Sequence, residues 1–209
     1  MHSYSTDSKE RKYIPLILIG VSIVFSMVSI AIWHSLHFEG LLGQIHSVIG
    51  YIVDFSAILY YDILFWLFND YLWKYCSFIP FCNIPNLNGK WEGIINSSFK
   101  DTETKERTIV TATMDINQKW QEMEIRFKSD NSESKTVTGA FFTKNSNAKE
   151  LTYQYENNLV PTSDIETMHS HDGTGWITIA SDLKSLEGKY YTGRDSSNNG
   201  GLSFTKVGK

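Results

Sequence analysis

The chain has 209 residues, of which 42% are hydrophobic and 14% aromatic, and its formal net charge is −4 at pH 7. This mildly acidic balance excludes a general surface for nucleic-acid polymers, which would be strongly basic. The two cysteines, Cys76 and Cys82, are too few for a disulfide framework, so we expect free thiols.

Two apolar stretches near the N-terminus have the length of membrane spans. Residues 14–33 contain no charged side chain, and residues 48–68 contain only Asp54 and Asp62. The hydrocarbon core of a bilayer requires about 20 apolar residues of helix. The sequence therefore predicts a membrane α-helical hairpin with two transmembrane helices, joined by a periplasmic connection over residues 34–47.

The positive charges beside the spans predict the orientation of the hairpin. Residues 34–47 contain no Lys or Arg, whereas residues 1–13 are basic. By the positive-inside rule, both termini lie in the cytoplasm, and residues 1–13 form a cytosolic N-terminal tail. The basic residues that flank the spans are Lys9, Arg11, Lys12 and Lys74.

Both predicted helices carry polar side chains that are not expected on a helix surrounded only by lipid. Three serines on the first have the small-residue spacing of close helix contacts. The second has a stripe with two aspartates, and an ionised aspartate near the bilayer centre costs about 2.5–3.5 kcal/mol. Three interpretations remain open: the stripes pack within one hairpin, the acidic stripe meets copies of itself in an oligomer, or it serves a proton relay. The candidate membrane-assembly residues are Ser22, Ser26, Ser29, Tyr51, Asp54 and Asp62.

After a juxtamembrane linker over residues 69–85, the sequence alternates between short strands and turns. Val110 and Ala112, for example, alternate with Thr111, which is typical of a sheet with one buried face. We expect residues 86–209 to form a small all-β domain, an antiparallel eight-stranded up-and-down, lipocalin-like β-barrel. The predicted strands are 90–99, 107–118, 120–128, 135–144, 151–156, 174–181, 186–193 and 202–207.

A barrel of this size has interior space for one small ligand. The first strand begins beside the membrane linker, so the opposite end would open to the cytosol. Inward parity places aromatic, hydroxyl and guanidinium side chains there, which can stack on bases and hold phosphate. For each tyrosine an ordinary core role is the alternative. The candidate ligand-binding residues are Ser97, Phe99, Thr108, Tyr153, Tyr155, Tyr190, Thr192 and Arg194.

No other constellation indicates catalysis. His169, Ser170, His171 and Asp172 have the composition of metal ligands, but on a long loop a solvated turn is the favoured interpretation. We find no Ser/His/Asp order, pair of catalytic carboxylates or glycine-rich phosphate loop. The sequence therefore predicts a protein that is not an enzyme and that has neither a metal nor a cofactor.

The segment Asn86-Leu87-Asn88-Gly89-Lys90-Trp91-Glu92-Gly93 resembles the Gly-x-Trp opening of lipocalin-like barrels. The closing segments 186–191 and 200–204 and the preceding hairpin are part of the same resemblance. The resemblance therefore covers essentially the whole chain. The family concerned is the two-transmembrane, β-strand-rich type of CD-NTase-associated membrane effector (S-2TM-beta type), found in bacterial CBASS anti-phage systems.

The resemblance implies a function for each part of the chain. A partner CD-NTase enzyme would synthesise a cyclic dinucleotide second messenger on infection, and the barrel would bind it. The protein would then oligomerise in the bacterial inner membrane, disrupt the lipid bilayer and kill the infected cell, which is abortive infection. The alternatives are a membrane-tethered, lipocalin-like carrier or sensor of an apolar small molecule, and a structural membrane adaptor with a solid barrel.

Overall fold

The chain divides into two compact units, one made of Lys9–Cys82 and one made of Met1–Ser8 with Asn83–Lys209. The first is helical and the second is a β-barrel. The computed structural model describes residues 1–36, 43, 45, 46, 48–50, 56–78, 82–100, 106–144, 148–159, 170–193 and 198–208.

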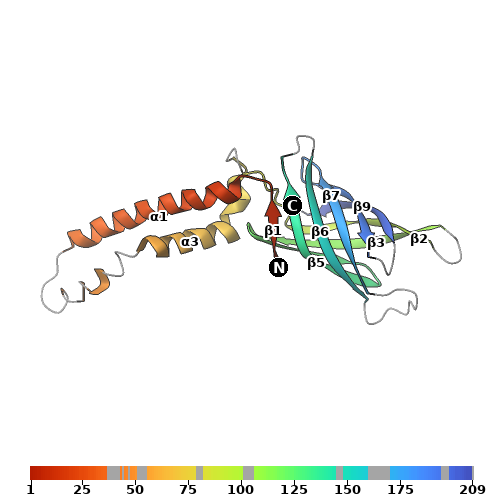
Figure 1. Cartoon of the computed structure of the whole chain (residues 1–209), viewed down its shortest axis with the longest axis horizontal. Coiled ribbons are helices and arrows are strands. Elements are labelled where there is room, and N and C mark those ends of the chain that lie inside the picture. Colours follow the sequence, from red (N-terminus) through yellow and green to blue (C-terminus); the bar gives the residue numbers. More distant parts are fainter. Residues whose placement is uncertain are drawn as a thin grey trace. The chain divides into compact units, whose positions relative to one another are not determined.

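The helical unit is built on two helices that lie side by side, α1 over Glu10–Ser35 and α3 over Ser56–Asp70 (Figure 1). A 3-10 helix, η1, follows over Leu72–Phe78. Among the described residues, α1 is the one helix that is long and apolar enough to cross a membrane. Because α3 has 15 residues and residues 51–55 lie outside the described part, the second crossing stays a prediction.

The predicted serine stripe of α1 faces α3. Ser22 and Ser26 are buried, and Ser26 Oγ lies 2.9 Å from Ser56 Oγ. The hydroxyls of Ser29 and Tyr60 also share a hydrogen bond. These contacts favour the interpretation in which the serines pack within one hairpin.

The acidic stripe of the second predicted span has a different position. Asp62 is exposed on α3, on a surface that also exposes the apolar side chains of Ile58 and Ile63. Tyr51 and Asp54 lie outside the described residues. The predicted assembly residues therefore include serines inside the hairpin and an aspartate on its surface.

The strands predicted from residue 86 onward are confirmed, with ends that shift by a few residues. Each pairs antiparallel with the next, and the last pairs with the first, so the sheet closes on itself (Figure 1). Their bounds are Gly89–Lys100 for β2, Arg107–Gln118 for β3, Glu122–Lys128 for β4, Ser132–Phe142 for β5, Lys149–Leu159 for β6, His171–Ile179 for β7, Ser185–Thr192 for β8 and Asn199–Val207 for β9.

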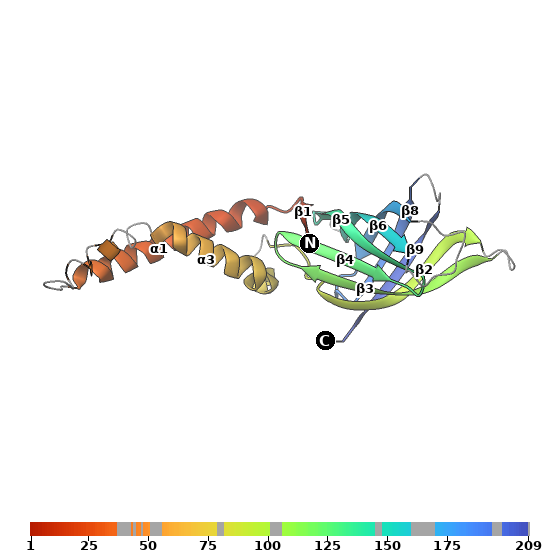
Figure 2. The same cartoon turned by 90° about the horizontal axis from the view of Figure 1, so that it is seen from below.

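A ninth strand, β1, corrects the predicted count of eight. It covers His2–Thr6, within the segment predicted as a tail. β4 and β5 pair directly only where residues 126–128 meet 133–135, and β1 lies between them beyond that point (Figure 2). Because β1 runs antiparallel to β4 but parallel to β5, the barrel is not purely antiparallel.

One end of the barrel is closed by the segment that leads into β2. Trp91 is fully buried, and its Nε1 donates a hydrogen bond to the carbonyl of Leu87 at 3.0 Å. The amide of Leu87 in turn donates to Gln118 Oε1 at 2.9 Å. Lys206 Nζ covers the Trp91 ring at 5.2 Å from its centroid. This end is therefore sealed.

Candidate ligand-binding site

A cavity of about 370 Å³ occupies the end of the barrel opposite Trp91. Its volume lies within the range of about 300–1,000 Å³ that small-molecule sites have. The structure brings every described residue of the predicted ligand site to its wall, whereas Arg194 lies outside the described residues. The predicted residues that line the cavity are Ser97, Phe99, Thr108, Tyr153, Tyr155, Tyr190 and Thr192.

Aromatic rings form one side of the cavity. The rings of Phe127 and Tyr153 are stacked with centroids 5.8 Å apart, and those of Tyr153 and Tyr155 are 6.1 Å apart. Burial raises the pKa of Tyr153, Tyr155 and Tyr190, although a hydrogen bond with Ser97 opposes the rise for Tyr190. All three tyrosines therefore keep a proton that their hydroxyls can donate.

Two glycines of β7 make room for these rings. A Cβ atom at Gly175 would lie 2.1 Å from Cζ of Tyr153, and one at Gly173 would lie 2.4 Å from Cζ of Tyr155. Both distances are far shorter than van der Waals contact between carbons. The tyrosine rings can lie against the barrel wall, and leave its centre open, because β7 has no side chain at these two positions.

A polar pair that the sequence analysis missed lies on β5 and β6. Ser134 Oγ donates a hydrogen bond to Asn157 Oδ1 at 2.6 Å. Asn157 belongs to the cavity lining, and its buried Nδ2 has no hydrogen-bond partner among the described residues. An unpaired buried donor costs about 1–3 kcal/mol, so an acceptor on a ligand at this point is favoured.

The inward parity of β6 could have identified Asn157. Tyr153 and Tyr155 point inward, and the next inward position is residue 157, one residue beyond the predicted strand end at 156. The strand in fact continues to Leu159.

The suspected metal ligands are placed differently from the prediction. His171 and Asp172 begin β7 rather than a loop turn, and His171 lines the cavity with its ring 6.5 Å from that of Tyr155. Across the described residues, no group of three His, Cys, Asp or Glu side chains could hold a metal ion. His169 lies outside the described residues.

The two cysteines belong to the helical unit and are free, as predicted. Burial raises the pKa of both thiols, and the carboxylate of Glu10 adds to the rise. Because the thiolate is the nucleophilic form, Cys76 and Cys82 are poor nucleophiles.

Two comparisons with known proteins bear on the barrel. Residues 82–206 match the family described as the Cap15 cyclic dinucleotide receptor domain. The chain is also 26% identical over 202 residues to CD-NTase-associated protein 15 of Yersinia aleksiciae, an alignment that covers 96% of this chain and 92% of that protein.

Proposed function

Because the chain belongs to the family of the Cap15 cyclic dinucleotide receptor domain, we propose that its cavity binds a cyclic dinucleotide and that the protein is an effector of a CBASS anti-phage system. The observation that carries the proposal is the cavity, which has tyrosine rings on one side and Asn157 in its lining. The Nδ2 atom of Asn157 has no hydrogen-bond partner among the described residues. A cyclic dinucleotide offers two bases that stack on aromatic rings and two phosphates that accept hydrogen bonds.

The proposal extends from binding to membrane disruption. A CD-NTase enzyme supplies the ligand, the bound protein assembles in the inner membrane with both termini in the cytoplasm, and the assembly breaks the bilayer. The apolar helix α1 and the exposed carboxylate of Asp62 support this role. Ligand binding can drive assembly only if the ligand binds the assembled state more tightly than the single chain. No catalytic step is required of this protein.

An apolar carrier is the second candidate function. An apolar ligand would fit beside the tyrosine rings but would leave Asn157 Nδ2 without a partner, at the cost that an unpaired buried donor carries. A structural adaptor with a solid barrel is disfavoured by the cavity of about 370 Å³.

Thermal unfolding of the full chain in detergent, with cyclic di- and trinucleotides added in turn, tests the proposed function. A ligand at about 100 times its Kd should stabilise the protein by about 2.7 kcal/mol, which raises the unfolding temperature measurably. The linear dinucleotides of the same bases are the control and should give a smaller shift. The proposal fails if no cyclic nucleotide shifts a cooperative transition, and a shift with fatty acids instead would support the carrier.

Gly175→Ala is expected to close the cavity without unfolding the barrel. The new methyl group displaces the Tyr153 ring from the wall towards the cavity, and such overpacking costs about 1–3 kcal/mol. We expect the affinity for the cyclic dinucleotide to fall by about tenfold or more, measured by equilibrium titration. The matched control is Gly201→Ala on β9, where the nearest atom is 3.9 Å from the new Cβ. Equal losses in both variants would contradict the explanation.

A further inference from the structure

β1 differs from the other described strands of the barrel because no hairpin joins it to a neighbour. Residues 7–88, which include the helical unit, separate it from β2. Its place is a slot between β4 and β5, formed by residues 122–123 on one side and residues 139–141 on the other, which pair with it. We call this place the β1 slot. The closed barrel has unpaired edges at β4 and β5 whenever β1 leaves the slot.

The β1 slot binds side chains as well as backbone. Tyr4 is buried, its hydroxyl donates to the carbonyl of Trp120 at 2.7 Å, and its ring meets Phe141 edge to face at 5.2 Å. Asp7 follows the strand, and its carboxylate accepts hydrogen bonds from N and Oγ1 of Thr143, both at 2.8 Å. The slot therefore recognises a particular peptide, with a tyrosine and an aspartate three residues apart.

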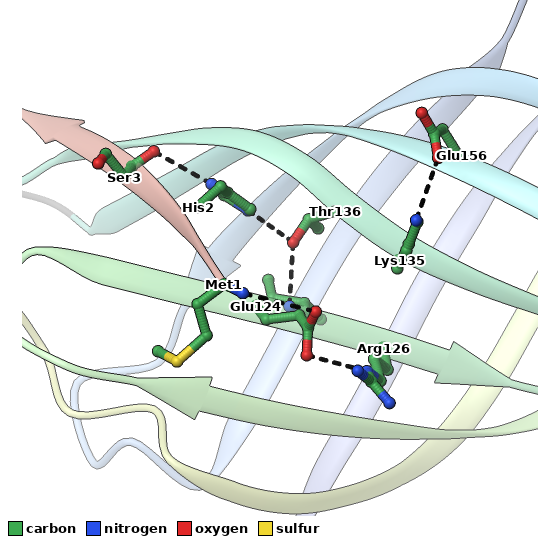
Figure 3. Close-up of polar contacts among 9 residues, drawn as sticks. Met1, His2, Ser3, Glu124, Arg126, Lys135, Thr136 and Glu156 are labelled. Carbon is green, nitrogen blue, oxygen red and sulfur yellow. Dashed lines mark hydrogen bonds and ion pairs between the residues drawn. The ribbon is translucent and has the colours of Figure 1, made fainter.

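Thr136 connects β1 to the two strands of the slot at the point where they separate (Figure 3). Its Oγ1 accepts the amide of Ile125 on β4 at 3.0 Å and lies 2.8 Å from Nε2 of His2 on β1. Near it, Glu124 lies 3.9 Å from the amino group of Met1. A shift of β5 relative to β4 must therefore change the contacts of β1.

The cavity and the β1 slot lie along the same two strands, β4 and β5. The β4–β5 hairpin lines the cavity with Phe127, Lys128 and Ser134, and Ser134 is two residues from Thr136. A ligand that contacts this hairpin acts on the strands that hold β1. On the other side, only residues 7–9 separate β1 from the apolar helix α1.

We infer that ligand binding releases β1 from its own slot and that β1 then occupies the slot of a neighbouring copy, so that exchanged strands link the assembled chains. The inference rests on the proposed function. A neighbour's β1 has the same sequence and makes the same contacts, which is the basis of strand exchange between protomers. Anchoring every β1 beside a membrane helix raises its effective concentration at neighbouring slots.

The contacts within the helical unit indicate that the serines of α1 do not join copies of the chain. Hydrogen bonds inside the hairpin engage the serines of α1, through Ser26 with Ser56 and Ser29 with Tyr60. These serines are therefore not available to join copies. An exchanged strand supplies a specific contact that the serine stripe does not.

Disulfide trapping between two full-length chains with different tags tests the exchange. One chain carries Ser5→Cys and the other Ala140→Cys, because these residues are partners in the β1–β5 ladder. Both are expressed in one membrane, cyclic di-GMP, cyclic di-AMP and cyclic GMP–AMP are added in turn, and the samples are oxidised. With a nucleotide that raises the unfolding temperature, we expect about tenfold more mixed disulfide dimer than without it.

Two controls define the background. In the first control, the second chain carries Thr178→Cys, on the exposed side of β7, instead of Ala140→Cys. This pair measures the disulfides that form by random collision. Wild-type chains oxidised in parallel account for Cys76 and Cys82. Adding Tyr4→Ala to the Ser5→Cys chain removes the buried ring and should abolish the increase.

The outcomes separate the inference from the proposed function. A third chain that carries both Ser5→Cys and Ala140→Cys reports the disulfide within one copy. If a nucleotide raises the unfolding temperature but only this internal disulfide forms and the mixed dimer does not, exchange is wrong and ligand binding stands. Equal amounts of mixed dimer with and without that nucleotide also overturn the ligand-driven exchange. If no nucleotide changes the unfolding temperature, the proposed function fails and the inference fails with it.

Discussion

Asn157→Asp is expected to lower the affinity for the cyclic dinucleotide by about 100-fold. The substitution keeps the size of the side chain but replaces the amide N–H donor of Asn157, which has no partner among the described residues, with a carboxylate oxygen. The lost hydrogen bond costs about 1–3 kcal/mol, and about 1.4 kcal/mol corresponds to a tenfold change in affinity. Repulsion between the carboxylate and the ligand's phosphates adds to the loss. Calorimetric titration of the full chain in nanodiscs measures it.

The next residue on β6 supplies the matched control. Asn158 is exposed, whereas Asn157 is 4% exposed, so Asn158→Asp makes the same change of charge outside the cavity. We expect that variant to bind within about twofold of the wild type, because exposed charges are screened by solvent and salt. If Asn158→Asp weakens binding as much as Asn157→Asp, the effect is one of net charge, and Asn157 does not contact the ligand.

The sequence predicted the barrel and much of its cavity wall because both depend on local patterns. Alternation with a period of two identifies which side chains point inward, and turn residues mark the strand ends. Tyr153 and Tyr155 were placed at the cavity by this parity alone. Asn157 lies beyond the predicted end of its strand at residue 156, because the position where a strand ends depends on its pairing with neighbouring strands more than on its own alternation. Gly173 and Gly175 were missed because their effect depends on rings from the neighbouring strand.

β1 could not be predicted in the same way. His2–Thr6 contains one apolar residue, Tyr4, so it shows no hydrophobic alternation. Its place depends on a register shift in β5 between Thr136 and Thr138, which coincides with the point where β5 stops pairing with β4. The partner strands lie more than a hundred residues away in the sequence, and no local signal specifies that pairing.

Helical periodicity predicted that the polar residues of each span lie on one side of the helix. It did not predict which helix or solvent that side contacts. The serines of α1 contact Ser56 and Tyr60 of α3. Asp62 is exposed instead, on the same helix as these two partners. The hairpin therefore provides hydrogen-bond partners for the serine stripe. It leaves the carboxylate of Asp62 on its surface, where lipid would disfavour the charge and the described part of α1 does not cover it.

Asp62→Leu is expected to abolish ligand-triggered leakage of a dye from vesicles that contain the full chain. An ionised aspartate near the bilayer centre costs about 2.5–3.5 kcal/mol, so the leucine variant should insert at least as well as the wild type. The variant loses the exposed carboxylate through which we propose that copies contact one another or admit water. The shift of the unfolding temperature with cyclic dinucleotide should be unchanged, because Asp62 belongs to the helical unit and the cavity to the barrel.

Two further variants separate charge from hydrogen bonding at this position. Asp62→Asn keeps the shape and the hydrogen-bonding capacity, so leakage that survives in Asn but not in Leu indicates a hydrogen bond between helices. Loss in both variants indicates that the negative charge is required. Ile58→Leu, an apolar exchange at another exposed position of α3, should leak like the wild type. If Asp62→Leu also leaks like the wild type, Asp62 has no part in assembly, and the contacts between copies must come from elsewhere, with the exchanged β1 strand as the remaining proposal.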